Sequence, residues 1–201
     1  QVASAPPDGL TIILSSESNH VLLPLLDSSF PLDVTKDFVP VSLSGQFQHT
    51  LIVKKELPVT SVQELVSYLR ANPGKLSFSS SGVGNPQQLA GELMNMMAGI
   101  NVLHVPYRGA APAVTDVATG AVTMSFTSLA AAQGLMQSGK IRAVAVTSLE
   151  RMPQLPDVAP LQEGSPGLKG YELLNWFGLF STGGTPADVV DKLNAVTNKT
   201  L

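Results

Sequence analysis

Short apolar runs alternate with segments of helical periodicity along most of this sequence. The pattern is most regular in the middle of the chain, where the predicted strands occupy residues 50–55, 76–79, 101–107, 121–128 and 141–148. Amphipathic segments long enough for helices lie between them. This alternation is typical of βα units around a mainly parallel sheet. The sequence therefore predicts an α/β fold, with further strands at 9–16, 39–43 and 175–182 and a final helix at 185–201.

Several helix ends can be read directly from the sequence. Ser61 and Glu64 have the spacing of a capping box, and Asn85 precedes a proline at the first helical position. Gly99 is placed to end the helix that Asn85 begins, and Thr185 is expected to cap the last helix. We expect the helix after Asn85 to turn one apolar face to the core, formed by Leu89, Leu93, Met96 and Met97.

Composition excludes several classes of protein. Hydrophobic residues make up 44% of the chain and charged residues 13%, which indicates a globular rather than a disordered protein. The net charge is -3 and no basic run is present, so we expect no nucleic-acid partner. No apolar stretch approaches the roughly 20 residues that a membrane helix needs. The absence of cysteine excludes disulfides and thiolate metal sites but does not distinguish a reducing from an oxidising compartment.

Two strand-to-helix loops have unusual chemistry. The first is the serine and glycine loop at 79–85, and the second is the stretch from Tyr107 to Ala111, ahead of Pro112. Both place small residues just before a helix, so backbone N–H groups and the positive end of the helix dipole are open to an anion. Loops at the carboxyl ends of strands are also where open parallel sheets bind ligands. The pattern favours a carboxylate site.

The same loops have a simpler interpretation, because glycine and serine before a helix often do no more than cap it. Arg108 is open to the same two interpretations, as a ligand contact or as a solvated surface residue. Enzyme chemistry has less support, since the chain has no G-x-S-x-G elbow and its three histidines are widely spaced. The dinucleotide-binding pattern fails at Gln87, where its third glycine would stand. We expect no catalysis, no cofactor and no metal.

A family resemblance is carried by the stretch "HVPYRGAAPAVTDVATGAVTMSFTSLAAAQGLMQSGKIRAVAVTSLERMPQLPDVAPLQE". Further collinear segments extend it over essentially the whole chain, including "PPDGLTIIL", "KDFVPVS", "PGKLSFSSSGVGNPQQLAGEL" and "WFGLFSTGGTPADVVDKLN". The chain resembles the Bug-type receptors, the periplasmic solute-binding proteins of tripartite tricarboxylate transporters. The resemblance implies a small carboxylate or dicarboxylate ligand, membrane permease subunits as partners, a periplasmic location and no catalysis.

The resemblance also implies a periplasmic-binding-protein-like fold of the type II, Venus-flytrap kind, built from two α/β lobes. The expected first lobe comprises residues 1–55 and 176–201, and the second comprises 56–175. Hinge strands are expected at 50–55 and 176–181.

Site residues carried over from the family by position fall into three groups. Those expected to hold a carboxylate through backbone amides and ordered water are Ser80, Ser81, Gly82, Gly84, Asn85, Tyr107, Gly109, Ala110 and Ala111. Thr127 and Ser128 match variable positions that face the other end of the ligand. Ser16, Ser18 and Asn19 occupy the corresponding strand-end loop of the first lobe.

The chain departs from the family at both ends. Family members begin with a strand, a P-F-x-P-G-G-x-x-D loop and further elements before "PPDG", and they continue beyond the position of Leu201. We therefore expect a fragment whose first lobe is incomplete, and the start at Gln1 is consistent with removal of an upstream piece. Exposed sheet in that lobe predicts a dimer and weak binding.

Two questions remain open from the sequence. The alternative to a transport receptor is a ligand-sensing effector domain of a regulator, which uses the same two-lobe fold. The ligand is also unassigned, because dicarboxylates, aromatic acids and acidic amino acids all suit a backbone-amide site.

Overall fold

The computed structural model describes residues 1–201, which divide into two compact units. Unit 1 comprises Gln1–Phe47 and Asn175–Leu201, and unit 2 comprises Gln48–Leu174. The chain therefore passes from one unit to the other twice. The lobe boundaries expected from the sequence differ by a few residues from those of the two units, because the expected first lobe included residues 50–55. In the structure, residues 50–54 pair with strands of unit 2 on both sides.

Unit 2 is built on a five-stranded sheet with the order β5-β4-β6-β3-β7. Its strands are β3 (Thr50–Lys54), β4 (Ser77–Ser80), β5 (Leu103–Pro106), β6 (Met124–Thr127) and β7 (Ile141–Val146). β4 is parallel to both β5 and β6, whereas β3 is antiparallel to β6 and β7. The mainly parallel sheet predicted from the sequence is confirmed, with β3 as the reversed strand.

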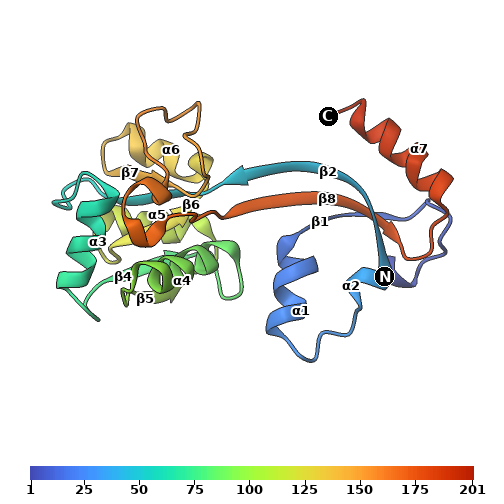
Figure 1. The fold of residues 1–201 in the computed structure, drawn as a ribbon, viewed down its shortest axis with the longest axis horizontal. Helices are drawn as coiled ribbons and strands as arrows, with labels where there is room; N and C mark the ends of the chain where they lie inside the picture. Colours follow the sequence, from blue (N-terminus) through green and yellow to red (C-terminus); the bar gives the residue numbers. More distant parts are fainter. The chain divides into compact units, whose positions relative to one another are not determined.

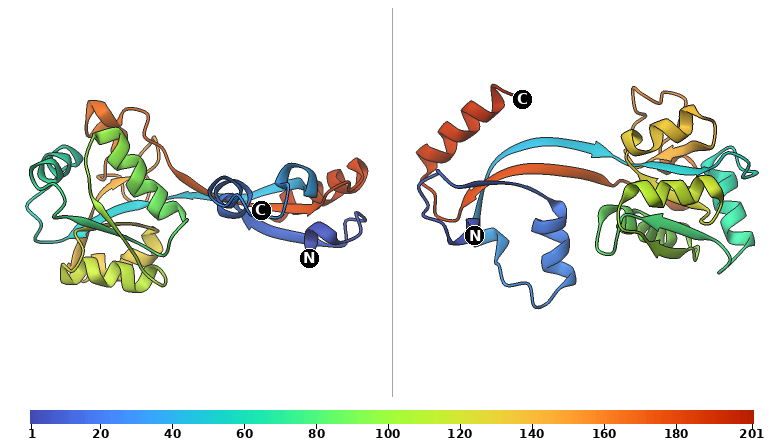
Figure 2. Two further views of the ribbon diagram at one scale, coloured as in Figure 1. Left: turned by 90° about the horizontal axis from the view of Figure 1, so that it is seen from below. Right: turned by 180° about the vertical axis from the view of Figure 1, so that it is seen from behind.

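Helices cover both faces of this sheet (Figure 2). α3 (Val62–Ala71) and α4 (Pro86–Ala98) pack on one face, and α5 (Ala110–Thr119) and α6 (Leu129–Gln137) pack on the other. Two short 3₁₀ helices, η3 (Leu161–Glu163) and η4 (Pro166–Leu168), follow β7. The larger of the two cores includes Leu65, Phe78, Met94 and Phe126, and the smaller includes Ile52, Val114, Val117 and Ile141.

The predicted helix ends of unit 2 are largely confirmed. The Asn85 side chain accepts a hydrogen bond from the Gln88 N–H at 2.9 Å, and Gly99 ends α4 with a left-handed φ of 60°. Ser61 accepts from the Glu64 N–H at 3.2 Å. The second hydrogen bond of that capping box differs from the usual one. The Glu64 carboxylate accepts from the backbone N–H and the hydroxyl of Thr60 instead of the N–H of Ser61.

The predicted core face of α4 is wrong in part. Met96 is 73% exposed and Leu89 is 44% exposed, while Ala90, Gly91 and Met94 are buried. The reason is close packing against β4, because a Cβ at Gly91 would overlap the Phe78 ring. The helix therefore turns Ala90 and Gly91, together with Met94, toward the sheet.

Unit 1 contains a three-stranded sheet with the order β1-β8-β2 (Figure 1). Its strands are β1 (Ile12–Ser16), β2 (Phe38–Gln48) and β8 (Leu174–Thr182), and β1 and β8 are antiparallel. A 3₁₀ turn, η1 (Val2–Ser4), precedes β1, and a π-helical turn, η2 (Ser18–Leu22), leads into α1 (Leu23–Leu26). The short α2 (Val34–Asp37) precedes β2, and α7 (Ala187–Asn198) follows β8.

The start of α7 differs from the prediction. Thr185 does not cap it, since its hydroxyl donates to the Thr182 carbonyl at 2.7 Å, and the residue at the cap position is Pro186. α7 is held to β2 by side-chain amides, including that of Asn194, which donates to the Val41 carbonyl at 2.6 Å. None of the helices combines the length and apolar character required to cross a bilayer.

Candidate functional site

Unit 2 gathers strand ends and helix starts at one edge of its sheet. β5, β4 and β6 are neighbours and parallel, so their last residues, Pro106, Ser80 and Thr127, lie at the same edge. The helix that follows each strand begins within a few residues, which brings the N-termini of α5, α4 and α6 to that edge. Helix N-termini carry unpaired N–H groups and the positive end of the helix dipole. The edge is therefore suited to an anion.

The serine and glycine loop is held by its own side chains. The Asn85 amide donates to Ser81 Oγ at 2.9 Å, and Ser81 Oγ donates to Gln87 Oε1 at 3.0 Å. The Gly84 N–H donates to Gln88 Oε1 at 2.7 Å. Gly82 adopts a φ of 149°, a conformation that residues with side chains rarely adopt. The loop is thus held by hydrogen bonds within the protein.

The second loop leaves the start of α5 without a side-chain cap. Gly109 occupies the cap position with a φ of 119° and contributes no side-chain acceptor. The N–H groups of Ala110 and Ala111 are in the first turn, where no intrahelical carbonyl is available to them. The two loops are close together, because the Tyr107 N–H donates to the Ser80 carbonyl at 3.0 Å. A Cβ built on Gly82 would lie 3.8 Å from the Tyr107 carbonyl oxygen.

The Tyr107 side chain is turned toward α5. Its hydroxyl donates to Asp116 Oδ2 at 2.6 Å, and this hydrogen bond raises the pKa of Tyr107 to about 12. The hydroxyl is therefore already used within the protein. Any contribution of Tyr107 to an anion site at this edge comes from its backbone.

A serine and histidine pair lies beneath the first loop, which the sequence did not predict. Ser80 Oγ lies 2.7 Å from His104 Nε2 and also donates to the Gly82 carbonyl at 2.6 Å. Because that carbonyl takes the hydroxyl proton, His104 Nε2 is the donor to Ser80. Burial lowers the pKa of His104, which favours its neutral form. The histidine supports the loop and is not oriented as a base for Ser80.

Thr127 and Ser128 follow the neighbouring strand β6, and they differ in whether the side-chain hydroxyl is hydrogen-bonded. Ser128 caps α6, since its Oγ accepts from the Ala131 N–H at 3.3 Å. Thr127 is 2% exposed, and its hydroxyl has no hydrogen-bond partner. Thr50, which faces Thr127 across the β3–β6 pairing, has an equally unpaired hydroxyl. No signal in the sequence pointed to Thr50, because its proximity depends on strand register.

Ser16, Ser18 and Asn19 belong to unit 1. Ser16 ends β1, and the other two lie in the π-helical turn that follows it rather than in a loop. Ser18 donates to the Glu17 carboxylate at 3.4 Å and Asn19 to Ser15 Oγ at 3.2 Å. Their role in ligand binding stays a prediction.

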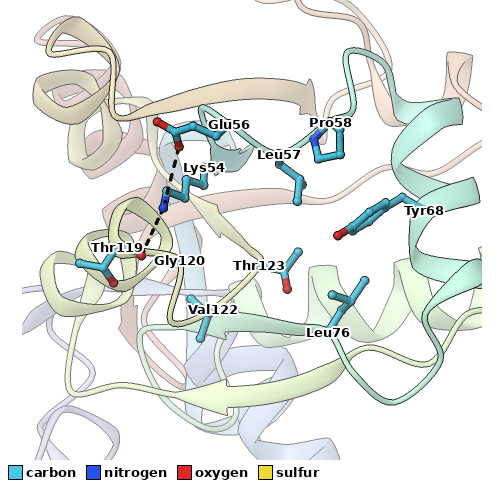
Figure 3. A pocket seen from close by; sticks show the side chains of 10 residues that line it. All are labelled: Lys54, Glu56, Leu57, Pro58, Tyr68, Leu76, Thr119, Gly120, Val122 and Thr123. Atoms are coloured by element: carbon cyan, nitrogen blue, oxygen red, sulfur yellow. Dashed lines mark hydrogen bonds and ion pairs between the residues drawn. The ribbon is translucent and has the colours of Figure 1, made fainter.

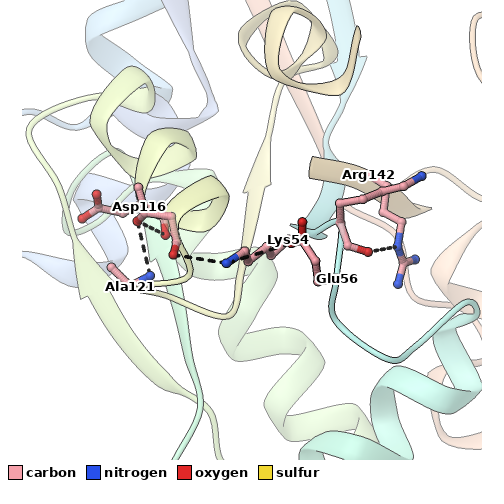
Figure 4. Close-up of polar contacts among 7 residues, drawn as sticks. Lys54, Glu56, Asp116, Ala121 and Arg142 are labelled. Atoms are coloured by element: carbon pink, nitrogen blue, oxygen red, sulfur yellow. Dashed lines mark hydrogen bonds and ion pairs between the residues drawn. The ribbon is translucent and has the colours of Figure 1, made fainter. Parts of the chain in front are cut away.

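A surface pocket of about 370 Å³ lies at the opposite edge of the unit 2 sheet (Figure 3). There, Lys54 Nζ lies 3.4 Å from the Thr119 carbonyl, at the C-terminus of α5, and 3.9 Å from Glu56 Oε2. Arg142 Nε donates nearby to the Lys55 carbonyl at 3.4 Å (Figure 4). The negative end of α5 and the Glu56 carboxylate disfavour an anion in this pocket. Lys54 instead stabilises the end of the helix whose start lies at the candidate site.

Chemically, the candidate edge offers backbone amides, hydroxyls and helix dipoles. No group of three or more histidine, aspartate or glutamate side chains is arranged to hold a metal ion. Such a set of donors is chemically suited to an oxyanion.

Comparison with known sequences places the chain in one family along its full length. The profile described as "Tripartite tricarboxylate transporter family receptor" matches residues 1–201. A protein from the tcbD–tcbE intergenic region of Pseudomonas sp. strain P51 is 40% identical over 200 residues, which cover 100% of this chain and 59% of that protein. Protein BugT of Bordetella pertussis is 30% identical over 200 residues, covering 99% of this chain and 61% of its own length. The chain thus spans about three fifths of these relatives.

Solved structures agree with the sequence comparison. The R. palustris protein Rpa4515, determined with adipate, is 36% identical with a TM-score of 0.83, covering 98% of this chain and 65% of that one. MatC from Rhodopseudomonas palustris, determined with bound malate, is 30% identical with a TM-score of 0.79. The match covers 98% of this chain and 67% of MatC. These likenesses confirm the two-lobe α/β fold of periplasmic binding proteins. The chain belongs to the Bug-type receptor family of tripartite tricarboxylate transporters.

Proposed function

We propose that this chain is the solute-binding part of a periplasmic receptor that captures a small organic carboxylate for a tripartite tricarboxylate transporter. The observation that carries the proposal is the uncapped start of α5 at Gly109, which faces the glycine loop at 82–85 across the carboxyl ends of β4 and β5. At α5 the N–H groups that can meet a ligand are those of the first turn. In the loop, the Gly82 and Gly84 N–H groups already donate to Ser80 Oγ at 3.2 Å and to Gln88 Oε1 at 2.7 Å, which leaves those of Ser81 and Val83. The receptor performs no chemistry and passes its ligand to the membrane subunits.

The free energies of these interactions are large enough for a carboxylate site without a buried arginine. A charge-assisted hydrogen bond contributes about 1.5 to 3 kcal/mol, and the end of a helix dipole adds about 0.3 to 1 kcal/mol. A few such bonds together approach the roughly 8 kcal/mol of a micromolar complex. The bound carboxylates of the two R. palustris proteins are dicarboxylates, which makes this class the first to test. We favour the receptor over a regulator's sensing domain because the family match is to transporter receptors.

The experiment is a thermal-shift screen of adipate, malate, an aromatic acid and aspartate against the purified protein. One of these acids is expected to raise the melting temperature in a saturable way, since ligand at about 100 times Kd adds roughly 2.7 kcal/mol. Gly109→Val should abolish the shift, whereas Gly134→Ala, on an open part of α6, should keep it. A screen in which no acid raises the melting temperature would contradict the proposal.

We also propose that unit 1 self-associates through its sheet. β1 forms one edge of that sheet, and several apolar side chains of unit 1 are exposed, among them Leu10 (86%), Leu14 (61%) and Leu25 (77%). Exposed edge strands and apolar patches favour pairing between chains. Light scattering after size exclusion should show a dimer that Leu14→Lys dissociates. A wild-type monomer at all concentrations would contradict self-association without affecting the proposed ligand site.

A further inference from the structure

Arg108 carries the only charge in the loops that present the candidate amides. These loops, at 81–85, at 107–109 and at Ser128, contain no other aspartate, glutamate, lysine or arginine. Arg108 is exposed, and its side chain makes no hydrogen bond or ion pair with the protein. The guanidinium is therefore a positive charge without a partner in the protein, next to a candidate anion site.

The lack of a partner distinguishes Arg108 from the other three arginines. Arg70 donates to a carbonyl at the end of α4, Arg142 donates to a carbonyl ahead of α3 at 2.9 Å, and Arg151 donates to the Glu163 carboxylate at 2.9 Å. Exposed arginines are common on protein surfaces, so exposure alone assigns no role. The position of Arg108 is what gives it one.

Arg108 lies between the two groups of candidate amides. The Tyr107 N–H donates to the Ser80 carbonyl at 3.0 Å, which carries the pairing of β5 with β4 past the end of the strand. The Tyr107 carbonyl group, whose carbon is bonded to the Arg108 nitrogen, has its oxygen 3.8 Å from a Cβ built on Gly82. The next residue, Gly109, occupies the cap position of α5. Arg108 thus has the glycine loop on one side and the uncapped helix start on the other.

Acidic side chains lie further along the elements that flank these loops. α4 and α5 carry one acidic residue each, Glu92 and Asp116, and each lies six residues, or roughly 9 Å, beyond the first residue of its helix. The charged residues that follow β7 at the same sheet edge, 150–151, are four strand positions from β5, or roughly 20 Å. Salt at about 0.1 M screens charges beyond roughly 10 Å. The local field at the amides is therefore set by Arg108 and the helix dipoles.

A solvent-exposed guanidinium adds little to affinity by direct contact. Exposed ion pairs change an equilibrium by no more than about fivefold, because water screens them and the long side chain loses freedom when it is held. The field of such a charge acts at longer range, since a charge at the mouth of a site raises the rate at which oppositely charged molecules reach it. The association rate is therefore the quantity on which Arg108 acts.

We propose that Arg108 steers small organic anions to the amides at 81, 83 and 110–111 and thereby sets the rate at which they bind. This inference rests on the proposed function, in which those amides hold the carboxylate. The bound carboxylate stays on the backbone amides. Its dissociation rate therefore depends on them and not on Arg108.

The test measures association and dissociation rates by NMR line-shape analysis during a titration with adipate, or with the acid that gives the largest shift in the thermal-shift screen. At about 20 mM NaCl, Arg108→Gln should lower the association rate constant about three- to tenfold and leave the dissociation rate within about twofold of wild type. At about 1 M NaCl, where the Debye length is about 3 Å, the two proteins should agree. Arg108→Lys keeps the charge and should keep the wild-type rate.

Lys140→Gln is the matched control. Lys140 is exposed and directly precedes β7, at the opposite edge of the sheet, so its substitution removes the same charge far from the loops. Its association rate should equal that of wild type. Because the Arg108 side chain has no partner in the protein, Arg108→Gln should melt at the wild-type temperature, which excludes misfolding as the cause of slower binding.

The outcomes separate steering from direct contact and from the proposed function. Faster dissociation of Arg108→Gln that persists at about 1 M NaCl, and that Arg108→Lys does not restore, would identify a direct contact and overturn steering. Unchanged rates in Arg108→Gln, or equal losses in Arg108→Gln and Lys140→Gln, would overturn steering while the receptor function stands. If no acid of the screen binds wild-type protein, both are overturned.

Discussion

Ser80 Oγ and His104 Nε2 lie 2.7 Å apart, beneath the loop that presents the amides of the candidate site. The pairing of β4 with β5 creates this contact, because it places Phe78 opposite His104 and Ser80 two residues further along. Burial lowers the pKa of His104 from its usual value of 6.5, and the opposing effect of the Glu92 charge is smaller. The folded state therefore favours the neutral imidazole over the charged one.

This contact predicts acid sensitivity. As the pH falls below about 6.5, the unfolded chain takes up a proton before the folded one does, so the free energy of unfolding decreases. His104→Gln retains a donor to Ser80 and removes the titration. Urea unfolding between about pH 7 and about pH 5 should show a shallower loss of stability in this variant than in wild type. His20, whose pKa burial also lowers, contributes equally to both proteins, so an identical loss in the two would refute the role of His104.

Two glycines of unit 2 should respond in opposite directions to the same substitution. A Cβ added at Gly109 or at Gly134 would have no atom within 4 Å, so sterics do not distinguish the two positions. Gly109→Ala forces an L-residue to a φ of 119° and should cost about 1 to 3 kcal/mol of stability. Gly134→Ala, inside α6, should add about 0.5 to 1 kcal/mol. Urea unfolding of both variants checks the pair, and equal signs would contradict the backbone assignment at Gly109.

Gly91 is expected to be intolerant of even one added methyl group. Its Cβ would overlap the Phe78 ring, so Gly91→Ala should lower stability by about 1 to 3 kcal/mol through overpacking. Phe78→Leu on its own should also destabilise, because it leaves a cavity. The double variant should be more stable than the sum of the single effects, since one change makes room for the other. Additive losses would show that the two residues do not share this contact.

Tyr107→Phe separates a structural hydroxyl from a ligand contact. The bond to Asp116 raises the pKa of Tyr107 to about 12 from 10.0, so its stabilising contribution is complete below pH 10.0 and is lost as the pH rises through about 12. The variant should lose about 1 kcal/mol at neutral pH, by urea unfolding, and keep its carboxylate affinity. A large loss of affinity with unchanged stability would place the hydroxyl on the ligand.

Much of unit 2 could be predicted from the sequence because its strands are apolar runs with helical segments between them. The face of α4 could not, because Gly91 and Ala90 pack where a large side chain would be expected, and only the position of the Phe78 ring explains this. In unit 1, the helical turns at 18–26 were not predicted, because they are short and contain a proline.

The candidate site, too, could be predicted from the sequence only in part. The glycine loop and Gly109 were predicted, since glycine before a helix start is a local signal. The partner of Ser80 and the position of Thr50 were not, because both depend on which strands pair and in what register. Whether a hydroxyl such as that of Thr127 is paired is likewise decided by its surroundings in three dimensions.

The proposed receptor function depends on backbone amides at two strand-to-helix junctions that bind one carboxylate. An NMR titration of isotopically labelled protein with adipate tests this binding at the atoms involved, by following the amide resonances of Ser81, Val83, Gly109, Ala110 and Ala111. We expect saturable downfield shifts of these amides, larger than those of amides beside the Lys54 pocket at the opposite sheet edge. Saturable binding that leaves the five amides unshifted would show that the carboxylate is held elsewhere.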